Sequence, residues 1–359
     1  MIKLLLSIVV ILMLSNNANA KKYIKILATG GTIAGKSQSS VDYASGQLNI
    51  AALIAEIPKI QEYTKISWQQ IANIGSQDMS IKIWKALYTA IEDAKKDDDV
   101  LGIVITHGTD TMVDSAFLFD LLFPSGKPLV FVGAMRNADA LSADGPQNLL
   151  DAIHVASSIE AVNRGALIVM NSRIIRARNA YKRHTAALGT FKTSNGSYAG
   201  DLYGDDVNFY HNFSREGENK SIFNVSDIDG IAQVSMMSVY PGLSVSYYKN
   251  ALSKINKALV VSGVGNGNFP SFIAKNIKEI VNMGAIIVRS SQVPEGYVSR
   301  NVEINDDQLG TIASLGLSPQ KSRILLGLLL KKNMSNSQIQ KIFECEVPTT
   351  DGSCGIFPN

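Results

Sequence analysis

Short, continuous runs of apolar and β-branched residues constrain the fold of this chain more than any other feature. They lie at Tyr23–Ala28, Leu101–Ile105, Pro128–Gly133 and Ala166–Met170. Runs of this length without polar alternation are typical of strands buried on both faces, as in a parallel sheet. Because segments of helical periodicity separate them, we expect right-handed βα repeats wound into a doubly wound sheet.

In the first part of the chain, helices are expected near 50–56, 81–96, 115–122 and 147–162, and a further strand near 65–71. A polar stretch without periodicity then separates this part from a second, smaller alternation. Its strands are expected near 231–237, 258–264 and 285–291, and its helices near 270–281 and 319–330. At 359 residues the chain is long enough for two domains. We therefore predict an α/β protein with a larger N-terminal, mainly parallel sheet domain and a smaller C-terminal α/β domain. The expected boundaries are 1–20 (signal peptide), 21–213 (N-terminal domain), 214–229 (linker), 230–344 (C-terminal domain) and 345–359 (tail).

The first twenty residues read as an export signal. Lys3 precedes an apolar stretch over Leu4–Leu14, which Ala18, Asn19 and Ala20 follow after three polar residues. A basic start, a short apolar core and a small-residue site are typical of a secretory signal peptide, here cut after Ala20. The apolar stretch is short for a bilayer span, although an uncleaved anchor is the alternative. We expect no membrane partner after cleavage.

The charge of the chain limits its possible binding partners. A formal net charge of +3, without a basic cluster interleaved with aromatic residues, argues against nucleic acid as a binding partner.

Both cysteines, Cys345 and Cys354, lie in the C-terminal tail. In an exported protein they are expected to form a disulfide that fixes the tail, with free thiols as the alternative. No metal is expected, because no histidine lies near them and their spacing matches no zinc pattern.

Polar loops follow three of the expected strands. Thr29–Thr32 follows the first, Asn73–Asp78 the second and Thr106–Thr111 the third. The carboxyl ends of parallel strands share one edge, where such sheets bind ligands. Ser76 with backbone N–H groups could hold a carboxylate there, and Asp110 could hold an ammonium group. The loops therefore predict a site for a small zwitterion.

The same loops carry candidate hydroxyl nucleophiles, which need a base. None of the four histidines lies in a Ser/His/Asp or metal-ligand pattern: His107, His154, His184 and His211. Lys182 is the candidate base, if burial or charge lowers its pKa. The simpler interpretation of Thr109 and Asp110 is that they cap the next helix.

A dinucleotide cofactor is not expected. The glycines of Thr29–Thr32 lack the G-x-G-x-x-G spacing, and Gly263–Asn268 has asparagine where the third glycine is required.

With these motifs, the chain closely resembles the bacterial type II L-asparaginases, exported members of the asparaginase/glutaminase family. The matching segments are ILATGGTIAG (Ile26–Gly35), NIGSQDM (Asn73–Met79), THGTDTM (Thr106–Met112), VGAMR (Val132–Arg136), SADGPQNL (Ser142–Leu149), GVGNGN (Gly263–Asn268), VRSSQVP (Val288–Pro294) and SPQKSRILL (Ser318–Leu326). The resemblance covers the chain from the end of the signal peptide to about Phe343. It implies a flavodoxin-like C-terminal domain, a homotetramer built as a dimer of intimate dimers, and no cofactor.

The resemblance also implies roles for individual residues. The catalytic set carried over is Thr32, Tyr43, Thr109, Asp110, Lys182 and Glu303, and the substrate-binding set is Gly31, Ser76, Gln77, Thr109, Asp110, Asn268 and Glu303. Thr32 matches the nucleophile, and Tyr43 matches the tyrosine that activates it from a lid, expected over Gly35–Gly46. Asn268 and Glu303 match groups that reach in from the neighbouring subunit.

The implied reaction is hydrolysis of L-asparagine to L-aspartate and ammonia through a threonine acyl-enzyme, with L-glutamine as a secondary substrate. A glutaminase-asparaginase with comparable rates on both amides is the alternative within this family. An exported amino-acid binding protein is the remote alternative. The expected location is the periplasm, on the assumption of a Gram-negative source.

Overall fold

The fold is described from a computed structural model of the chain. It describes residues 22–37, 43–44, 50–55, 57, 60, 64–211, 221–255 and 257–345. The expected signal peptide, Cys354, most of the expected lid and part of the expected linker lie outside these ranges. Every helix within these ranges is too short or too polar to span a lipid bilayer.

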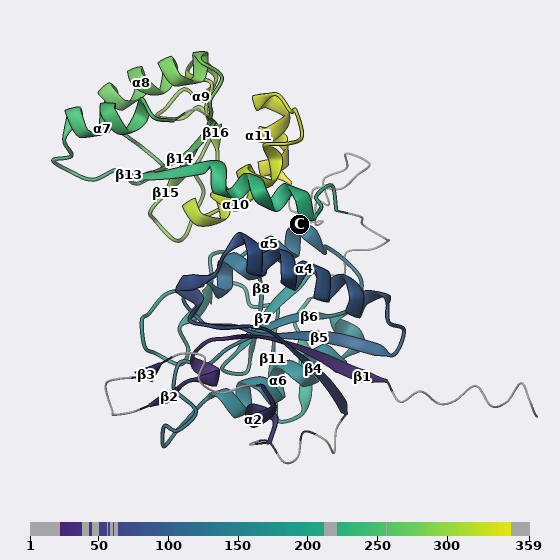
Figure 1. Cartoon of the computed structure of the whole chain (residues 1–359). Coiled ribbons are helices and arrows are strands. Elements are labelled where there is room, and N and C mark those ends of the chain that lie inside the picture. The colour runs from purple at the N-terminus through teal and green to yellow at the C-terminus, as the bar shows by residue number, and fades with distance from the viewer. Residues whose placement is uncertain are drawn as a thin grey trace, which may run out of the picture.

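A sheet of eight strands forms the centre of the larger domain (Figure 1). Its strands are β1 (Tyr23–Gly30), β4 (Lys65–Ile74), β5 (Val100–Thr106), β6 (Leu129–Val132), β7 (Ala166–Met170), β8 (Arg173–Arg176), β11 (Gly200–Tyr203) and β12 (Asp206–Phe209). They lie in the order β12-β11-β8-β7-β6-β5-β1-β4. The strands from β4 to β7 pair in parallel, and β8, β11 and β12 extend the sheet antiparallel. The predicted mainly parallel sheet is confirmed.

Helices cover both faces of this sheet. The helical elements are η1 (Thr32–Ala34), α2 (Ile50–Ala55), η2 (Ser76–Asp78), α4 (Ile81–Lys96), α5 (Met112–Leu122), α6 (Gly145–Ser157) and η3 (Ile159–Ala161). In Figure 1, α4 and α5 lie on the face toward the smaller domain, and α2 and α6 lie on the opposite face. Helix α5 is apolar around nearly its whole circumference, because it packs between the sheet and the smaller domain.

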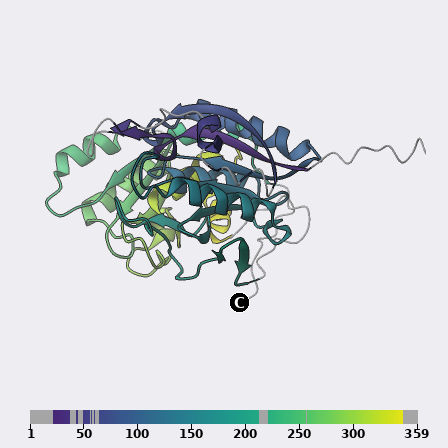
Figure 2. The ribbon, with the colours of Figure 1, turned by 90° about the horizontal axis from the view of Figure 1, so that it is seen from below.

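The smaller domain contains a four-stranded parallel sheet in the order β13-β14-β15-β16. Its elements are η4 (Val225–Gln233), β13 (Val234–Ser238), α7 (Val245–Leu252), β14 (Ala258–Gly263), α8 (Ser271–Asn282), β15 (Ile286–Ser291), α9 (Asp306–Leu309), β16 (Ile312–Ala313), α10 (Pro319–Leu329) and α11 (Asn336–Glu344). Helix α10 contacts α5, and η4 contacts α4, which joins the two domains. Seen from below, the smaller domain lies behind the larger one and extends past it on one side (Figure 2).

Two expectations about secondary structure were wrong. No strand was expected between Met170 and residue 231, yet this part of the chain contains β8, β11, β12 and the hairpin of β9 (Ala180–Lys182) with β10 (Phe191–Thr193). Strands of three or four residues carry too little periodicity to be recognised. The strand expected over 231–237 begins only at Val234, because η4 extends to Gln233 from a capping box formed by Asn224 and Asp227.

The order of strands locates the candidate site. Because β1 lies between β4 and β5, the direction in which successive strands are added reverses at β1. Ligands of open α/β sheets bind at such a switch point, beyond the carboxyl ends of the strands. The loops after β1, β4 and β5 are the three that the sequence singled out.

Candidate active site

The three loops touch one another at the edge of the sheet. Gly31 has a φ of +89°, and a Cβ added to it would lie 2.5 Å from the Cα of Gly108. Gly108 is also close to Ser76, since a Cβ added to Gly108 would lie 2.8 Å from the Ser76 Oγ. Thr111 donates from its hydroxyl to the Ser76 carbonyl at 2.8 Å. Glycine is therefore required at positions 31 and 108 for the loops to meet.

The two threonines of the first loop have different surroundings. Thr29 is buried and donates from its hydroxyl to the Thr106 carbonyl at 2.8 Å, which ties the end of β1 to the end of β5. Thr32 begins η1 directly after the Gly31 turn and is 8% exposed. The Gly31 N–H donates to the Ile74 carbonyl at 2.9 Å. Thr29 and the Gly31 N–H thus hold the loop, and Thr32 follows directly on this anchored turn.

Lys182 lies against the third loop. It comes from β9, and its Nζ donates to the Thr109 Oγ1 at 2.9 Å and to the Asp110 Oδ1 at 2.6 Å. The Lys182 side chain is 16% exposed, whereas that of Asp110 is 67% exposed. The structure therefore brings together a hydroxyl, an amine and a carboxylate from the catalytic set that the resemblance implied, with the carboxylate on the solvent side.

A buried chain of hydrogen bonds supports the third loop from behind. The ring of His107 lies 2.7 Å from the Gly108 carbonyl through Nδ1 and 2.9 Å from the Ser115 Oγ through Nε2. Because a carbonyl oxygen only accepts, we assign the proton to Nδ1, so that Ser115 donates to Nε2. Trp84 in turn donates from its indole N–H to the Ser115 Oγ at 2.9 Å. Burial lowers the pKa of His107 to about 4, so the ring is neutral near pH 7.

The remaining residues predicted in the larger domain are placed as follows. Ser76 is buried at the start of η2, and Gln77 is exposed with its amide folded back over Gly75. Tyr43 lies in β3 (Tyr43–Ala44), which pairs antiparallel with β2 (Lys36–Ser37). Because of this pairing, the backbone at Tyr43 lies beside Lys36–Ser37, a segment that follows Thr32 by only a few residues.

Asn268 and Glu303 meet in the smaller domain, where the Asn268 amide donates to the Glu303 carboxylate. The Asn268 Oδ1 is buried and has no hydrogen-bond partner among the described residues. A buried ion pair holds the two loops that carry them. Arg289 pairs with Asp306 at 2.7 Å and donates to the Ser299 carbonyl at 2.8 Å and to the Asn266 carbonyl.

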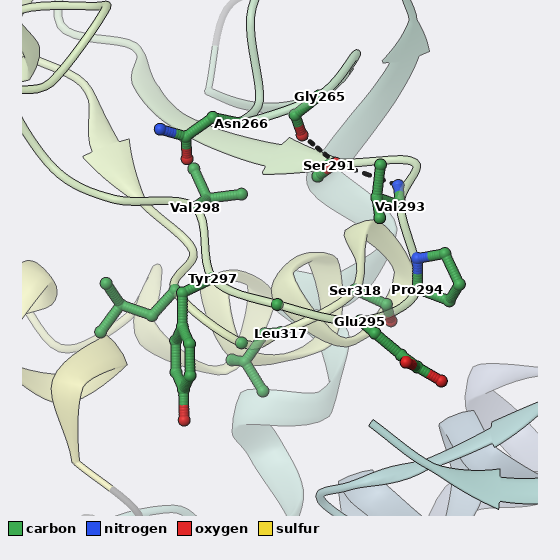
Figure 3. Close-up of a pocket in the computed structure, with 13 residues that line it drawn as sticks. Gly265, Asn266, Ser291, Val293, Pro294, Glu295, Tyr297, Val298, Leu317 and Ser318 are labelled. Carbon is green, nitrogen blue, oxygen red and sulfur yellow. Dashed lines mark hydrogen bonds between the residues drawn. The ribbon is translucent and has the colours of Figure 1, made fainter. Parts of the chain in front are cut away.

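A pocket of about 290 Å³ opens at the carboxyl ends of β14 and β15, and Asn266, whose carbonyl accepts from Arg289, is among its lining residues (Figure 3). Glu295 lies at its rim with the carboxylate pointing away from the other lining residues. That carboxylate accepts a hydrogen bond at 2.5 Å from the hydroxyl of Tyr181, the residue before Lys182. Thr32, Thr109 and Lys182 do not line this pocket.

The disulfide prediction concerns the end of the described chain. Cys345 directly follows α11 and is 3% exposed. Its predicted partner, Cys354, lies outside the described residues, so the pairing stays a prediction.

The fold defines the class as a two-domain α/β protein, and its candidate site lies at a switch point of the larger sheet. Comparison with known families gives two matches. The family model "Asparaginase, N-terminal" matches residues 23–215, and the model "Glutaminase/Asparaginase C-terminal domain" matches residues 233–343. The chain belongs to the asparaginase/glutaminase family, and it is an enzyme of the L-asparaginase type. The resemblance predicted from the motifs is confirmed.

Individual relatives match along nearly their whole length. The "Probable L-asparaginase periplasmic" of Haemophilus influenzae is 39% identical over 91% of this chain and 94% of its own. "L-asparaginase 2" of Escherichia coli is 36% identical over 92% and 94%. The "Glutaminase-asparaginase" of Acinetobacter glutaminasificans is 36% identical over 90% and 99%. The crystal structure of a probable cytoplasmic L-asparaginase from Campylobacter jejuni superimposes with a TM-score of 0.84 at 37% identity, covering 90% of this chain and 99% of its own.

Sequence reasoning misses the supports behind the site. In the sequence, His107 is only a histidine outside any catalytic pattern, and nothing singles out Trp84 or Ser115. His107 lies inside the motif THGTDTM, which is the one signal that could draw attention to it. The contact of Tyr181 with Glu295 joins positions 114 residues apart and leaves no local trace.

Proposed function

We propose that this enzyme hydrolyses L-asparagine to L-aspartate and ammonia, with Thr32 as the nucleophile. The observation that carries the proposal is the contact of Lys182 with Thr109 and Asp110 beside the loop of Thr32. A hydroxyl, an amine and a carboxylate in contact, next to a second threonine anchored on a glycine turn, supply the groups that covalent amide hydrolysis requires.

The reaction then proceeds in two halves. The Thr32 oxygen attacks the side-chain amide carbon, its proton passes to the departing nitrogen, and the C–N bond breaks to release ammonia. Water next attacks the resulting ester, which releases aspartate and returns the proton to Thr32. A threonine hydroxyl is a weak nucleophile, so a base must remove its proton. Tyr43, together with Glu303 of a neighbouring subunit, fills this role in the first half, and Lys182 with Thr109 aids proton transfer with the water in the second.

Binding of the amino-acid end uses the other loops. Ser76 and Gln77 hold the α-carboxylate, and the exposed carboxylate of Asp110 holds the α-ammonium. Asp110 already pairs with Lys182, so a bound ammonium group would share that carboxylate. Substrate binding and the lysine are thereby coupled through one side chain.

The working unit is a homotetramer made of intimate dimers. Asn268 and Glu303, paired on the smaller domain, would complete the site of a neighbouring subunit. The buried Oδ1 of Asn268 is an acceptor that a donor at such an interface could satisfy. We further propose export to the periplasm with cleavage after Ala20, and a disulfide between Cys345 and Cys354.

A glutaminase-asparaginase is the second candidate function. A relative of that name is 36% identical, the same value as for an L-asparaginase 2. The two substrates differ by one methylene, which a pocket distinguishes by only about 1–3 kcal/mol. Overall identity therefore does not separate the two activities.

The test is ammonia release by the mature protein from Lys21 onward, with L-asparagine and L-glutamine assayed side by side. We expect release from asparagine, and a loss of at least about 1,000-fold in kcat for Thr32→Ala, because the nucleophile is absent. Thr32→Ser keeps the hydroxyl and is the matched control. Comparable rates on both amides would favour the second candidate, and full activity of Thr32→Ala would reject Thr32 as the nucleophile.

A further inference from the structure

Lys321, in the first turn of α10, crosses from the smaller domain into the larger one. Its side chain is buried, and its Nζ donates to the carbonyl oxygens of Ala177, Arg178 and Ala180 at 2.9, 2.7 and 2.7 Å. These residues lie in the stretch 177–180, which leads from β8 into the first residue of β9 and ends two residues before Lys182. This stretch is called the turn below. An ammonium group has three N–H donors, and here each has a backbone acceptor.

Most carbonyl groups of the turn accept their hydrogen bond from this side chain. Of its four carbonyls, the three named above accept from Lys321, and that of Asn179 accepts from the Ser194 N–H at 2.9 Å. Without Lys321, these three carbonyls would lose the Nζ donor. Two of the three residues, Ala177 and Ala180, are buried. Buried backbone acceptors of this kind normally have partners, so the turn would rearrange.

This position is unfavourable for a lysine on local grounds. A cation in the first turn of a helix opposes the helix dipole. Burial lowers the pKa of Lys321 to about 7, against the opposite effect of the nearby Asp114 carboxylate. Arg178 adds to the lowering, and Asp120 opposes it. A residue that breaks local rules is expected where the chain needs it for another purpose.

The smaller domain also holds the next residue of the same strand. The hydroxyl of Tyr181 donates to Glu295, which lies at the rim of the pocket in Figure 3. Lys321 therefore fixes the backbone up to Ala180, Glu295 fixes Tyr181, and the following residue is Lys182. Both contacts come from the smaller domain, and Lys182 itself reaches back to Thr109 in the larger domain.

We propose that Lys321 is a positioning residue: with Glu295, it holds β9 so that the Lys182 amine meets Thr109 and Asp110. This inference rests on the catalytic role proposed for Lys182. The smaller domain then positions a residue in the site of its own chain, in addition to any residue that it contributes to the site of a neighbouring subunit. A role in joining the domains alone would stabilise the protein without acting through Lys182.

A double-mutant cycle separates these roles. We expect Lys321→Met to lower kcat about 10- to 100-fold with a much smaller change in KM, since displacement of about 1 Å has effects of this size. In a Lys182→Met background the same substitution should cause no further loss. Lys85→Met is the matched control, because Lys85 also joins the domains, through Asp229 at 2.5 Å, but lies on α4. It should leave kcat unchanged.

The outcomes are distinguishable. A folded Lys321→Met protein with wild-type kcat, or a loss that persists in the Lys182→Met background, overturns the inference and leaves the proposed function intact. Wild-type activity of Lys182→Met alone rejects the proposed role of Lys182 and the inference with it. If Lys321→Met does not fold, Tyr181→Phe decides: a kcat loss of about threefold or more that vanishes in the Lys182→Met background supports the inference, and an unchanged kcat overturns it.

Discussion

At the scale of single residues, the site depends on groups that do no chemistry themselves. His107 is fully buried and holds the Gly108 carbonyl through one ring nitrogen while the other accepts from Ser115. This arrangement requires a neutral ring. Protonation of Nε2 would place its N–H opposite the Ser115 hydroxyl, which could then no longer donate its own proton to Nε2. Acid that protonates His107 is therefore expected to disturb the loop that carries Thr109.

We predict that His107 gives the protein a pH-dependent stability. Its pKa is about 4 in the folded protein against an ordinary value of 6.5, so the unfolded state binds more protons between these values. The contribution is complete above pH 6.5 and is lost as the pH falls toward 4, by up to about 3 kcal/mol. Urea unfolding at a series of pH values should show this slope in the wild type and a shallower one in His107→Gln. The exposed His184→Gln is the control, and equal slopes in wild type and His107→Gln would contradict the prediction.

At the scale of elements, the site depends on loops that approach more closely than side chains allow. Gly31 and Gly108 provide this approach between the loops after β1 and β5. The larger strands and helices that carry these loops were predictable, because their apolar runs and periodicity are local. The short strands around β9 were not, because they are held by pairing and by contacts distant in the sequence.

We predict that Gly31→Ala lowers kcat/KM by at least about 100-fold, because its Cβ would lie 2.5 Å from Gly108 and displace Thr32. Gly196→Ala is the matched control. Gly196 also has a positive φ of +76°, but a Cβ there meets nothing within 4 Å. It should cost only about 1–2 kcal/mol of stability from the left-handed backbone, with kcat/KM unchanged. Equal kinetic effects of the two substitutions would show that close approach at Gly31 is unimportant.

At the scale of the whole molecule, the sequence predicted the two-domain α/β fold and the sheet edge at which the loops of the candidate site meet. Parallel strands place their following loops together, so the order of strands and loops along the chain was enough to group Ser76, Thr109 and Asp110. Lys182 could be named only as one candidate among many lysines until the resemblance singled it out. Lys321 lies in the motif SPQKSRILL, but its contacts could not be predicted, since its acceptors are backbone carbonyls more than 140 residues away.

We predict that mixed subunits restore activity that neither parent has. If Glu303 completes a neighbour's site, Thr32→Ala and Glu303→Gln proteins are each inactive alone. A dimer containing one subunit of each has one site with both groups intact. Co-refolding or co-expression of the two variants should therefore recover a sizeable fraction of wild-type ammonia release, whereas Thr32→Ala mixed with Thr32→Ala, Glu303→Gln subunits should recover none. No recovery in dimers shown to be mixed would place Glu303 outside the neighbour's site.

The central claim is that Thr32, and not Thr109, carries the acyl group. The most direct measurement is acid quenching of the enzyme during turnover of L-asparagine, followed by peptide mapping by mass spectrometry. The account predicts the mass of one aspartyl group on the peptide that contains Thr32, and its disappearance in Thr32→Ala. An aspartyl group on the peptide that contains Thr109 would contradict the account.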